Sequence, residues 1–247
     1  MKHSFPAPAL SNPLLKEAVK KFISTLYAML AALMITGGPA WAAEPENMAW
    51  KQVIEYHGII GYARHNPRCR IDEIKAIGII DEPLAVVEAV IRDVPGNKDF
   101  MFMCKHTAFL EIPEMKNTPD DYVTYTLMDM PFPVNDREAV ARVSWTVDKT
   151  TGTLYAAGQS VTTNYPLQAG VIRIPMVEAL YTLTPKGPDK TELTYQAMSD
   201  PGGNLPAFLV SILSRDLGVK TLAGIRKIAE QGKYRQATIV ATTTPKK

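Results

Sequence analysis

The side chains that could carry out catalysis are few, and their spacing does not suit it. His57 and His65 share one strand-like run, and a continuous strand would hold them roughly 26 Å apart, too far to share a metal ion. His106 has no carboxylate at ligand spacing, since Glu111 is five residues away. None of the candidate serines has the context of a nucleophile elbow: Ser160, Ser199, Ser211 and Ser214. We therefore expect no catalytic residue, no metal site and no cofactor.

The chain has two cysteines, Cys69 and Cys104. In an oxidising compartment they could form one disulfide. The alternative is that both are free thiols or small buried apolar residues. Neither belongs to a C-x-x-C motif or a histidine cluster, so a redox or zinc site is not indicated.

The first 42 residues have the pattern of an export signal. Lys16, Lys20 and Lys21 precede an apolar run over 22–36, and Ala40-Trp41-Ala42 supplies small residues for cleavage. The run has roughly fifteen residues, fewer than the roughly twenty that span a bilayer, so a retained anchor is the less favoured alternative. We expect cleavage after Ala42 and an exported protein, either periplasmic or secreted.

Charge excludes one class of function. Beyond residue 42 the chain has 23 Lys and Arg against 24 Asp and Glu, so it lacks the basic surplus of a general nucleic-acid binder. We expect one domain over 43–235. The polar stretch 236–247 has no hydrophobic face and is predicted to be a disordered tail.

Hydrophobic periodicity predicts helix, strands, then helix. A short helix is expected over 48–55 and a second over 84–93, where apolar residues recur every three or four positions. Alternating runs predict strands over 56–64, 71–80, 107–112, 122–130, 139–148, 154–165, 171–184 and 191–198. A long amphipathic helix follows residue 204, with Gly218 as a possible bend. This order predicts an α+β fold, in which a curved antiparallel sheet wraps around the last helix. The pattern alone favours a solid core over a hollow one.

Several segments occur in a characteristic order: Tyr125 with the run 130–138 (MPFPVNDRE), then 171–175 (VIRIP), 183–185 (LTP), 191–195 (TELTY) and 200–206 (DPGGNLP). Together they resemble the START family of lipid-transfer domains, over about residues 47–232. The resemblance implies a helix-grip fold. It also implies one internal apolar cavity of lipid size between the sheet and the C-terminal helix, gated by that helix and the loop 131–136.

The resemblance also suggests roles for individual residues. The predicted lipid contacts are Tyr125, Phe132, Arg173, Tyr195, Phe208, Leu209 and Ile212, with plain packing or exposure as the alternative for each. Gly202 and Gly203 are the predicted hinge of the last helix. Arg137 is expected to anchor the proline loop through Asp136, Glu138 or backbone carbonyls. Sterol-carrying relatives have a second arginine six residues later inside the cavity, where this chain has Val143. Arg142 is one position short and should leave the opposite face of the strand.

The function this implies is non-catalytic binding, and transfer, of a single hydrophobic lipid, either sterol-like, hopanoid-like or a phospholipid. The expected partners are the lipid and, transiently, membrane surfaces, and the protein is expected to be a monomer. One alternative is an interaction scaffold with a filled core, and another is a helix-grip enzyme acting on a hydrophobic substrate. Lipid that copurifies would distinguish a carrier from a scaffold, and turnover of that lipid would distinguish an enzyme from a carrier.

Overall fold

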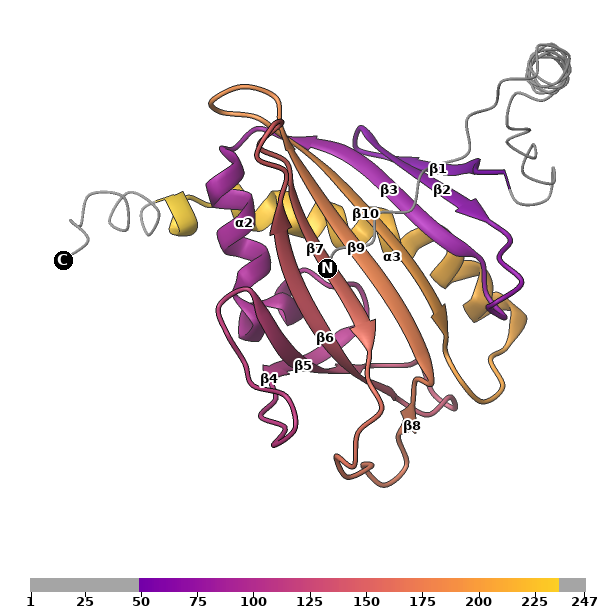
Figure 1. Ribbon diagram of the computed structural model, residues 1–247. Coiled ribbons are helices and arrows are strands. Elements are labelled where there is room, and N and C mark those ends of the chain that lie inside the picture. Colours follow the sequence, from indigo (N-terminus) through magenta and orange to yellow (C-terminus); the bar gives the residue numbers. More distant parts are fainter. Residues whose placement is uncertain (1–48, 236–247) are drawn as a thin grey trace, which may run out of the picture. The chain divides into compact units, whose positions relative to one another are not determined.

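The strands form one largely antiparallel sheet with helices on one side (Figure 1). The computed structural model describes residues 49–235. The predicted export signal (1–42) and the predicted tail (236–247) lie outside the described residues.

The sheet follows the order β1-β2-β3-β10-β9-β7-β6-β5-β4, and β8 joins it beside β6. Its strands are β1 Lys51–Tyr56, β2 Ile59–Arg64, β3 Glu73–Ile80, β4 Cys104–Phe109, β5 Asp121–Met128, β6 Arg137–Val147, β7 Leu154–Ser160, β8 Ile172–Arg173, β9 Met176–Pro185 and β10 Thr191–Asp200. All neighbours along this order are antiparallel, and β8 alone pairs in parallel, opposite the start of β6.

The first predicted element is wrong. The structure has no opening helix in its described part, because residues 51–56 form β1 and pair with β2. His57 and Gly58 both have positive φ angles, 50° and 71°, and form the tight turn between the two strands. The single strand predicted over 56–64 is therefore the end of one strand, a hairpin turn and a second strand, and His57 and His65 do not lie along one strand.

The predicted helix over 84–93 is α2, Leu84–Arg92, and a short 3-10 helix, η2, follows at Val94–Asp99. The last helix, α3, runs without interruption over Ala207–Ala229. Gly218 therefore does not break α3. It is buried against β3, where an added Cβ would lie 3.2 Å from the Cβ of Ala76, so a small residue lets the helix approach the sheet closely.

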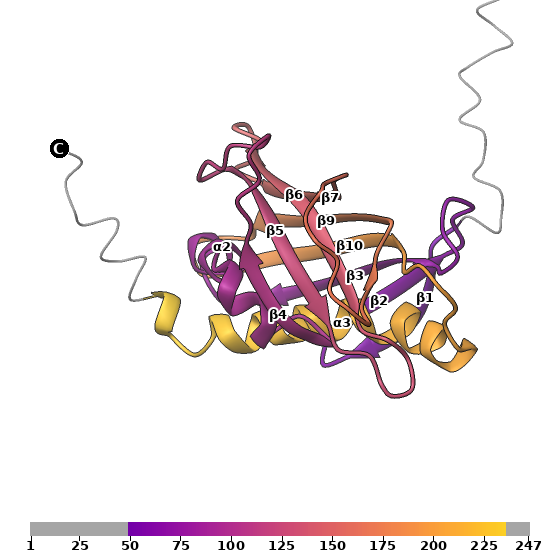
Figure 2. The ribbon, with the colours of Figure 1, turned by 90° about the horizontal axis from the view of Figure 1, so that it is seen from below.

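α3 lies along the sheet, close to β2 and β3 (Figure 2). An added Cβ on Gly61 would lie 2.8 Å from the Val219 side chain, and one on Gly78 would lie 3.2 Å from that of Leu222. Apolar side chains from α2, α3 and these strands form the largest buried cluster, which includes Ile59, Val87 and Ile225. The helix is therefore packed tightly at one side of the sheet, and the remaining strands curve past it.

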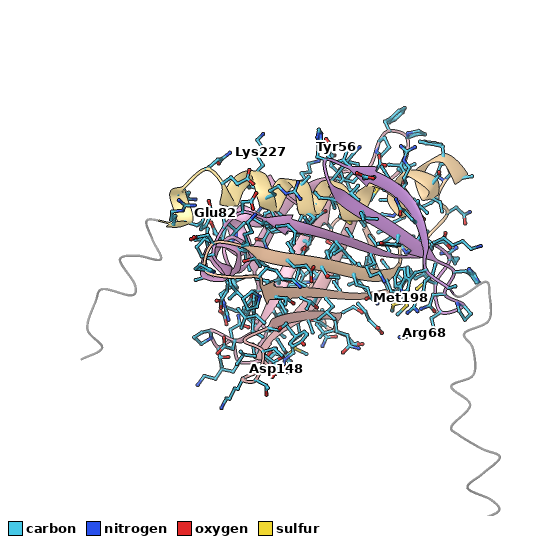
Figure 3. The ribbon with its side chains drawn as sticks, turned by 90° about the horizontal axis from the view of Figure 1, so that it is seen from above. Tyr56, Arg68, Glu82, Asp148, Met198 and Lys227 are labelled. Atoms are coloured by element: carbon cyan, nitrogen blue, oxygen red, sulfur yellow. The ribbon has the colours of Figure 1, made fainter. Side chains whose placement is uncertain are left out.

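The end of the described chain is fixed to the rest of the fold. Arg235 donates from Nε and Nη2 to the carboxylate of Glu82, at 3.0 and 2.7 Å. The hydroxyl of Tyr234 donates to Asp93 at 2.6 Å. Figure 3 shows Glu82 beside the last part of α3. These contacts hold the segment after α3 against the loop after β3 and against the end of α2.

Candidate functional site

A pocket lies between α3 and the inner face of the sheet. It measures about 190 Å³ as the volume open to the centre of a water-sized sphere, many times the roughly 10–15 Å³ that one water needs. Most of its lining is apolar, and the sheet contributes residues at every second position, because alternate side chains of a strand share a face. The sheet lining includes Tyr122, Thr124, Thr126, Met128, Arg137, Ala139, Ala141, Val143, Ala156, Gly158, Val177, Ala179, Tyr181, Tyr195, Ala197 and Ser199.

Small residues on neighbouring strands leave this space open. Gly158, Ala179 and Ala197 are direct cross-strand neighbours on β7, β9 and β10, and all three line the pocket. An added Cβ on Gly158 would lie 3.9 Å from its nearest side-chain atoms, so the strand backbone is not crowded here. The pocket therefore results from a row of small side chains, on the part of the sheet that α3 does not press against.

Two stacked tyrosines place polar groups in the apolar wall of the pocket. Tyr181 and Tyr195 are cross-strand neighbours with ring centroids 4.6 Å apart and an interplanar angle of 19°. Burial raises the pKa of Tyr195 to about 12 and raises that of Tyr181 well above its usual value. Within residues 49–235, neither hydroxyl has a hydrogen-bond partner. Both hydroxyls are thus neutral groups able to donate to a ligand.

α3 lines the pocket with Leu213, Leu217 and Thr221, one residue per turn. The Oγ1 of Thr221 also accepts a hydrogen bond from the backbone N–H of Phe102, at 3.2 Å. This is not the stripe predicted from the sequence. Phe208 is 59% exposed, and Leu209 and Ile212 are absent from the lining. Leu209 is buried instead against Met130 and Leu213, because the first turn of α3 extends past the pocket.

Arg137 is the charged residue of the pocket lining, and it is 1% exposed. Its guanidinium donates to three backbone carbonyls: Nε to Pro201 (3.3 Å), Nη1 to Asn135 (2.5 Å) and Nη2 to Gly202 (3.1 Å). Backbone carbonyls were one of the expected sets of partners; Asp136 and Glu138 were the others. Arg137 therefore joins the proline loop to the segment that leads into α3.

Tyr125 and Arg173 lie on the outer face of the sheet, so their predicted position in the cavity is wrong. Glu138 is fully buried there and accepts from Arg173 Nε and from the Tyr125 hydroxyl, both at 2.9 Å. The Gln168 side chain donates to the same hydroxyl at 2.7 Å. Burial, followed by the nearby Glu138 carboxylate, raises the pKa of Tyr125. This network fastens the segment between β7 and β8 over β5 and β6.

Phe132 also lies outside the pocket, and it is 98% exposed at the tip of the proline loop. The loop itself is held in place. Asp136 Oδ1 accepts from the backbone N–H of Met130 at 3.0 Å, and the Asn135 side chain donates to the carbonyl of Gly170 at 2.8 Å. Of the seven predicted lipid contacts, Tyr195 alone lies in the pocket lining.

The predicted hinge glycines occupy a tight turn. Gly202 and Gly203 have φ angles of +64° and +59°, the left-handed region that favours glycine. An added Cβ on Gly203 would lie 3.0 Å from the Ile172 side chain. Both residues therefore suit the turn whose carbonyls accept hydrogen bonds from Arg137. Their role as a hinge stays a prediction.

The second arginine of sterol-carrying relatives has no counterpart in the pocket. Val143 occupies that position and lines the pocket. Arg142 leaves the opposite face, where its side chain is 47% exposed and its Nε donates to Asp121 at 2.6 Å.

The cysteines are both free. Cys104 lines the pocket, and burial raises its pKa to about 11. Cys69 is buried, and burial also raises its pKa. The free-thiol alternative therefore describes this structure. Residues 49–235 contain no group of three potential metal-ligating side chains and no helix long and apolar enough to cross a membrane.

The sequence alone did not single out several lining residues, among them Ala179, Tyr181, Leu213 and Leu217. Their signal was present in part, because Val177, Ala179 and Tyr181 alternate within one predicted strand. Periodicity shows which residues share a face, and it does not show which part of that face the helix leaves uncovered.

Comparison with known proteins identifies the family to which this chain belongs. The START domain model matches residues 42–230, so the chain belongs to the START domain family. The fold is the helix-grip fold expected from the resemblance, and START domains bind lipids. An uncharacterized protein of Pseudomonas aeruginosa is 30% identical over 210 residues, covering 85% of this chain and 98% of that protein.

Two solved structures show the same fold. A STAR-related lipid transfer protein from Xanthomonas axonopodis is 24% identical, with a TM-score of 0.66 over 74% of this chain and 99% of that chain. Human STARD10 is 21% identical, with a TM-score of 0.66 over 82% of this chain and 81% of that chain.

Proposed function

We propose that this protein binds one lipid molecule in the pocket between the sheet and α3, and transfers it between membranes without changing it chemically. The row of small residues on the sheet carries this proposal, because it leaves an apolar space within a family that binds lipids. Burying on the order of 400 Å² of lipid surface, at roughly 25 cal/mol per Å², provides about 10 kcal/mol before the costs of association. That is enough to hold a lipid away from water.

The chemistry of the lining supports a carrier rather than an enzyme. No Asp, Glu or His of the described chain lines the pocket. General acid–base catalysis usually relies on those side chains, with a pKa near the working pH. The ionisable groups that are present, Arg137, Cys104 and the tyrosines, keep their protons at neutral pH.

Exposed apolar side chains support transient contact with a membrane. Phe132, Leu167 and Phe208 are 98%, 67% and 59% exposed. They lie on the β5–β6 loop, the β7–β8 loop and the first turn of α3, which gather at the lower end of the sheet in Figure 1. Asn135 joins the two loops, and the β5–β6 loop shares a surface pocket with Leu205 and Pro206. Membrane contact at this end would bring lipids of the bilayer close to the pocket.

The pocket lacks the second arginine of sterol-carrying relatives. With Val143 in place of the second arginine, direct analogy with sterol carriers is weak, and the proposed ligand is either hopanoid-like, sterol-like or a phospholipid. We further propose that the protein acts as a monomer outside the cytoplasm, after cleavage near Ala42. N-terminal sequencing of the exported protein should start at Ala43, and an intact Met1 would contradict export by cleavage.

Mass spectrometry of an organic extract tests the main proposal. Protein purified from its native compartment should yield about one lipid per chain, and that lipid should stay unmodified after prolonged incubation. The purified protein should also move the lipid between donor and acceptor vesicles. Protein free of lipid, and unable to move it, would contradict a carrier; a converted lipid would indicate an enzyme.

A further inference from the structure

Arg137 is a buried cation that no described carboxylate neutralises. A guanidinium carries five N–H groups, and three from Arg137 go to the neutral carbonyls of Asn135, Pro201 and Gly202. Burial lowers its pKa, and within residues 49–235 no carboxylate forms an ion pair with it. A buried charge without a counter-ion raises the free energy of the folded protein. A ligand that brings an anion beside this side chain would therefore be bound more tightly.

The acids next to Arg137 in the sequence, and the acid that precedes the turn it binds, have other partners. Asp136 accepts from the Met130 backbone and pairs with Lys105 at 3.2 Å. Glu138 leaves the other face of β6 and pairs with Arg173 at 2.8 Å. Asp200 accepts from the backbone N–H of Gly202 at 3.0 Å. None of these carboxylates therefore forms an ion pair with Arg137.

The position of Arg137 fits a headgroup site. Its side chain lines the main pocket and also the surface pocket formed by the proline loop, Ile172 and residues 204–206. α3 begins directly after this segment, and Pro206 at its N-cap makes no side-chain capping bond. The positive end of the helix dipole adds to the charge of Arg137 at the same place.

We infer that the lipid carries an anionic headgroup, a phosphate or a carboxylate, which binds the Arg137 guanidinium while the tail occupies the main pocket. This inference rests on the proposed lipid-binding function. The tail meets the apolar wall of small residues, and the headgroup lies toward the surface pocket, where it keeps partial access to water. The spare N–H groups of Arg137 supply charge-assisted hydrogen bonds to the anion.

Calorimetric titration of the wild-type protein with three dodecyl amphiphiles tests the inference. Dodecyl phosphate, dodecanoate and dodecanol share one tail and differ in headgroup, and at pH 8 the first two are anions. We expect the better anion to bind about tenfold or more tightly than dodecanol, the contribution typical of a charge-assisted hydrogen bond. Preference for the phosphate would indicate a phospholipid-type headgroup, and preference for the carboxylate would indicate a free fatty acid.

Equal binding of dodecanol and both anions would overturn the headgroup inference and leave lipid binding intact. Binding of none of the three would count against the proposed function, and the headgroup inference would fall with it. Arg137→Lys should keep part of the preference for the anion, and Arg137→Met should remove it. Arg142→Met is the matched control, since Arg142 lies on the opposite face of the same strand and should keep the full preference. If Arg137→Met does not fold, the wild-type comparison and Arg137→Lys still decide the matter.

Discussion

Arg137 and Glu138 are consecutive residues of β6, and their side chains fasten two different segments to opposite faces of the sheet. Arg137 points to the pocket face and holds the Pro201-Gly202 turn before α3. Glu138 points to the outer face and holds Arg173 of β8, which follows the segment between β7 and β8. β8 itself pairs with these two positions, Ile172 opposite Arg137 and Arg173 opposite Glu138. These two consecutive residues therefore fix both segments at the end of the sheet that is proposed to contact the membrane.

Replacing Arg137 should loosen the turn before α3. Arg137→Ala removes two buried hydrogen bonds and one part-buried one, and should lower the free energy of unfolding by about 1–3 kcal/mol, measured by urea denaturation. Amide hydrogen exchange should rise around residues 200–206. Arg142→Ala, which removes an exposed ion pair, should change stability much less. An unchanged unfolding midpoint for Arg137→Ala would show that these bonds contribute nothing to the fold.

Replacing Glu138 should loosen the segment between β7 and β8 on the outer face of the sheet. Glu138→Gln leaves Arg173 without its carboxylate and should lower the free energy of unfolding by about 2 kcal/mol, the scale of a hydrogen bond to a charged group. Hydrogen exchange should rise over residues 161–173 and stay unchanged at the start of α3. A rise at the start of α3 equal to that over 161–173 would contradict the separation of the two faces.

Exposed phenylalanines should govern membrane contact. The double variant Phe132→Ser/Phe208→Ser should weaken binding to phosphatidylglycerol-containing vesicles about tenfold or more, because burying one phenylalanine contributes roughly 1.5–3 kcal/mol. Its melting temperature should not fall, since both side chains are largely exposed. Val147→Ser is the control, because Val147 is 49% exposed at the other end of β6. Equal losses for the two variants in a co-sedimentation assay would argue against this end as the membrane contact.

The rate at which the Cys104 thiol is alkylated should depend on its burial in the pocket and on bound lipid. Burial raises its pKa to about 11 from the usual 9.0, so the reactive thiolate at pH 8 is on the order of 100-fold scarcer than for a free cysteine. In a Cys69→Ser variant, the rate of alkylation by iodoacetamide should keep rising with pH through pH 10. Bound lipid should slow it further, because Cys104 lines the pocket. A rate that levels off near pH 9, or that ignores lipid, would contradict this placement.

The sequence was most informative about the strands. Period-two alternation placed most strands to within a few residues, and loop prolines and glycines separated them. The 171–184 run failed in part, because Pro175 interrupts it and β8 pairs with β6 while β9 lies between β7 and β10. β1 was missed because its six residues are exposed or half-buried at the sheet edge, so they lack a clear apolar alternation. Its strand form depends on pairing with β2 across the His57-Gly58 turn.

The candidate site was harder to predict than the fold. In α3, apolar residues three and four apart allow more than one inward stripe, and the sequence favoured Phe208, Leu209 and Ile212. In the structure Leu213 and Leu217 line the pocket instead, because α3 first passes over the pocket at those turns. Arg173 and Tyr125 were expected at the ligand because both belong to the segments that resemble the START family. Their real partner, Glu138, is close only in three dimensions.

The lipid content of two leucine variants tests the central claim most directly. Ala179 lines the pocket, and Ala157 is exposed on the outer face of the adjacent strand β7. Both variants, Ala179→Leu and Ala157→Leu, would be purified alongside the wild type, and the lipid per chain measured by mass spectrometry, with melting temperature as the check on folding. We predict that Ala179→Leu folds and loses most of its lipid, because its side chain occupies the tail's space, and that Ala157→Leu keeps the wild-type amount. A folded Ala179→Leu protein with its full complement of lipid would contradict the claim that this pocket holds it.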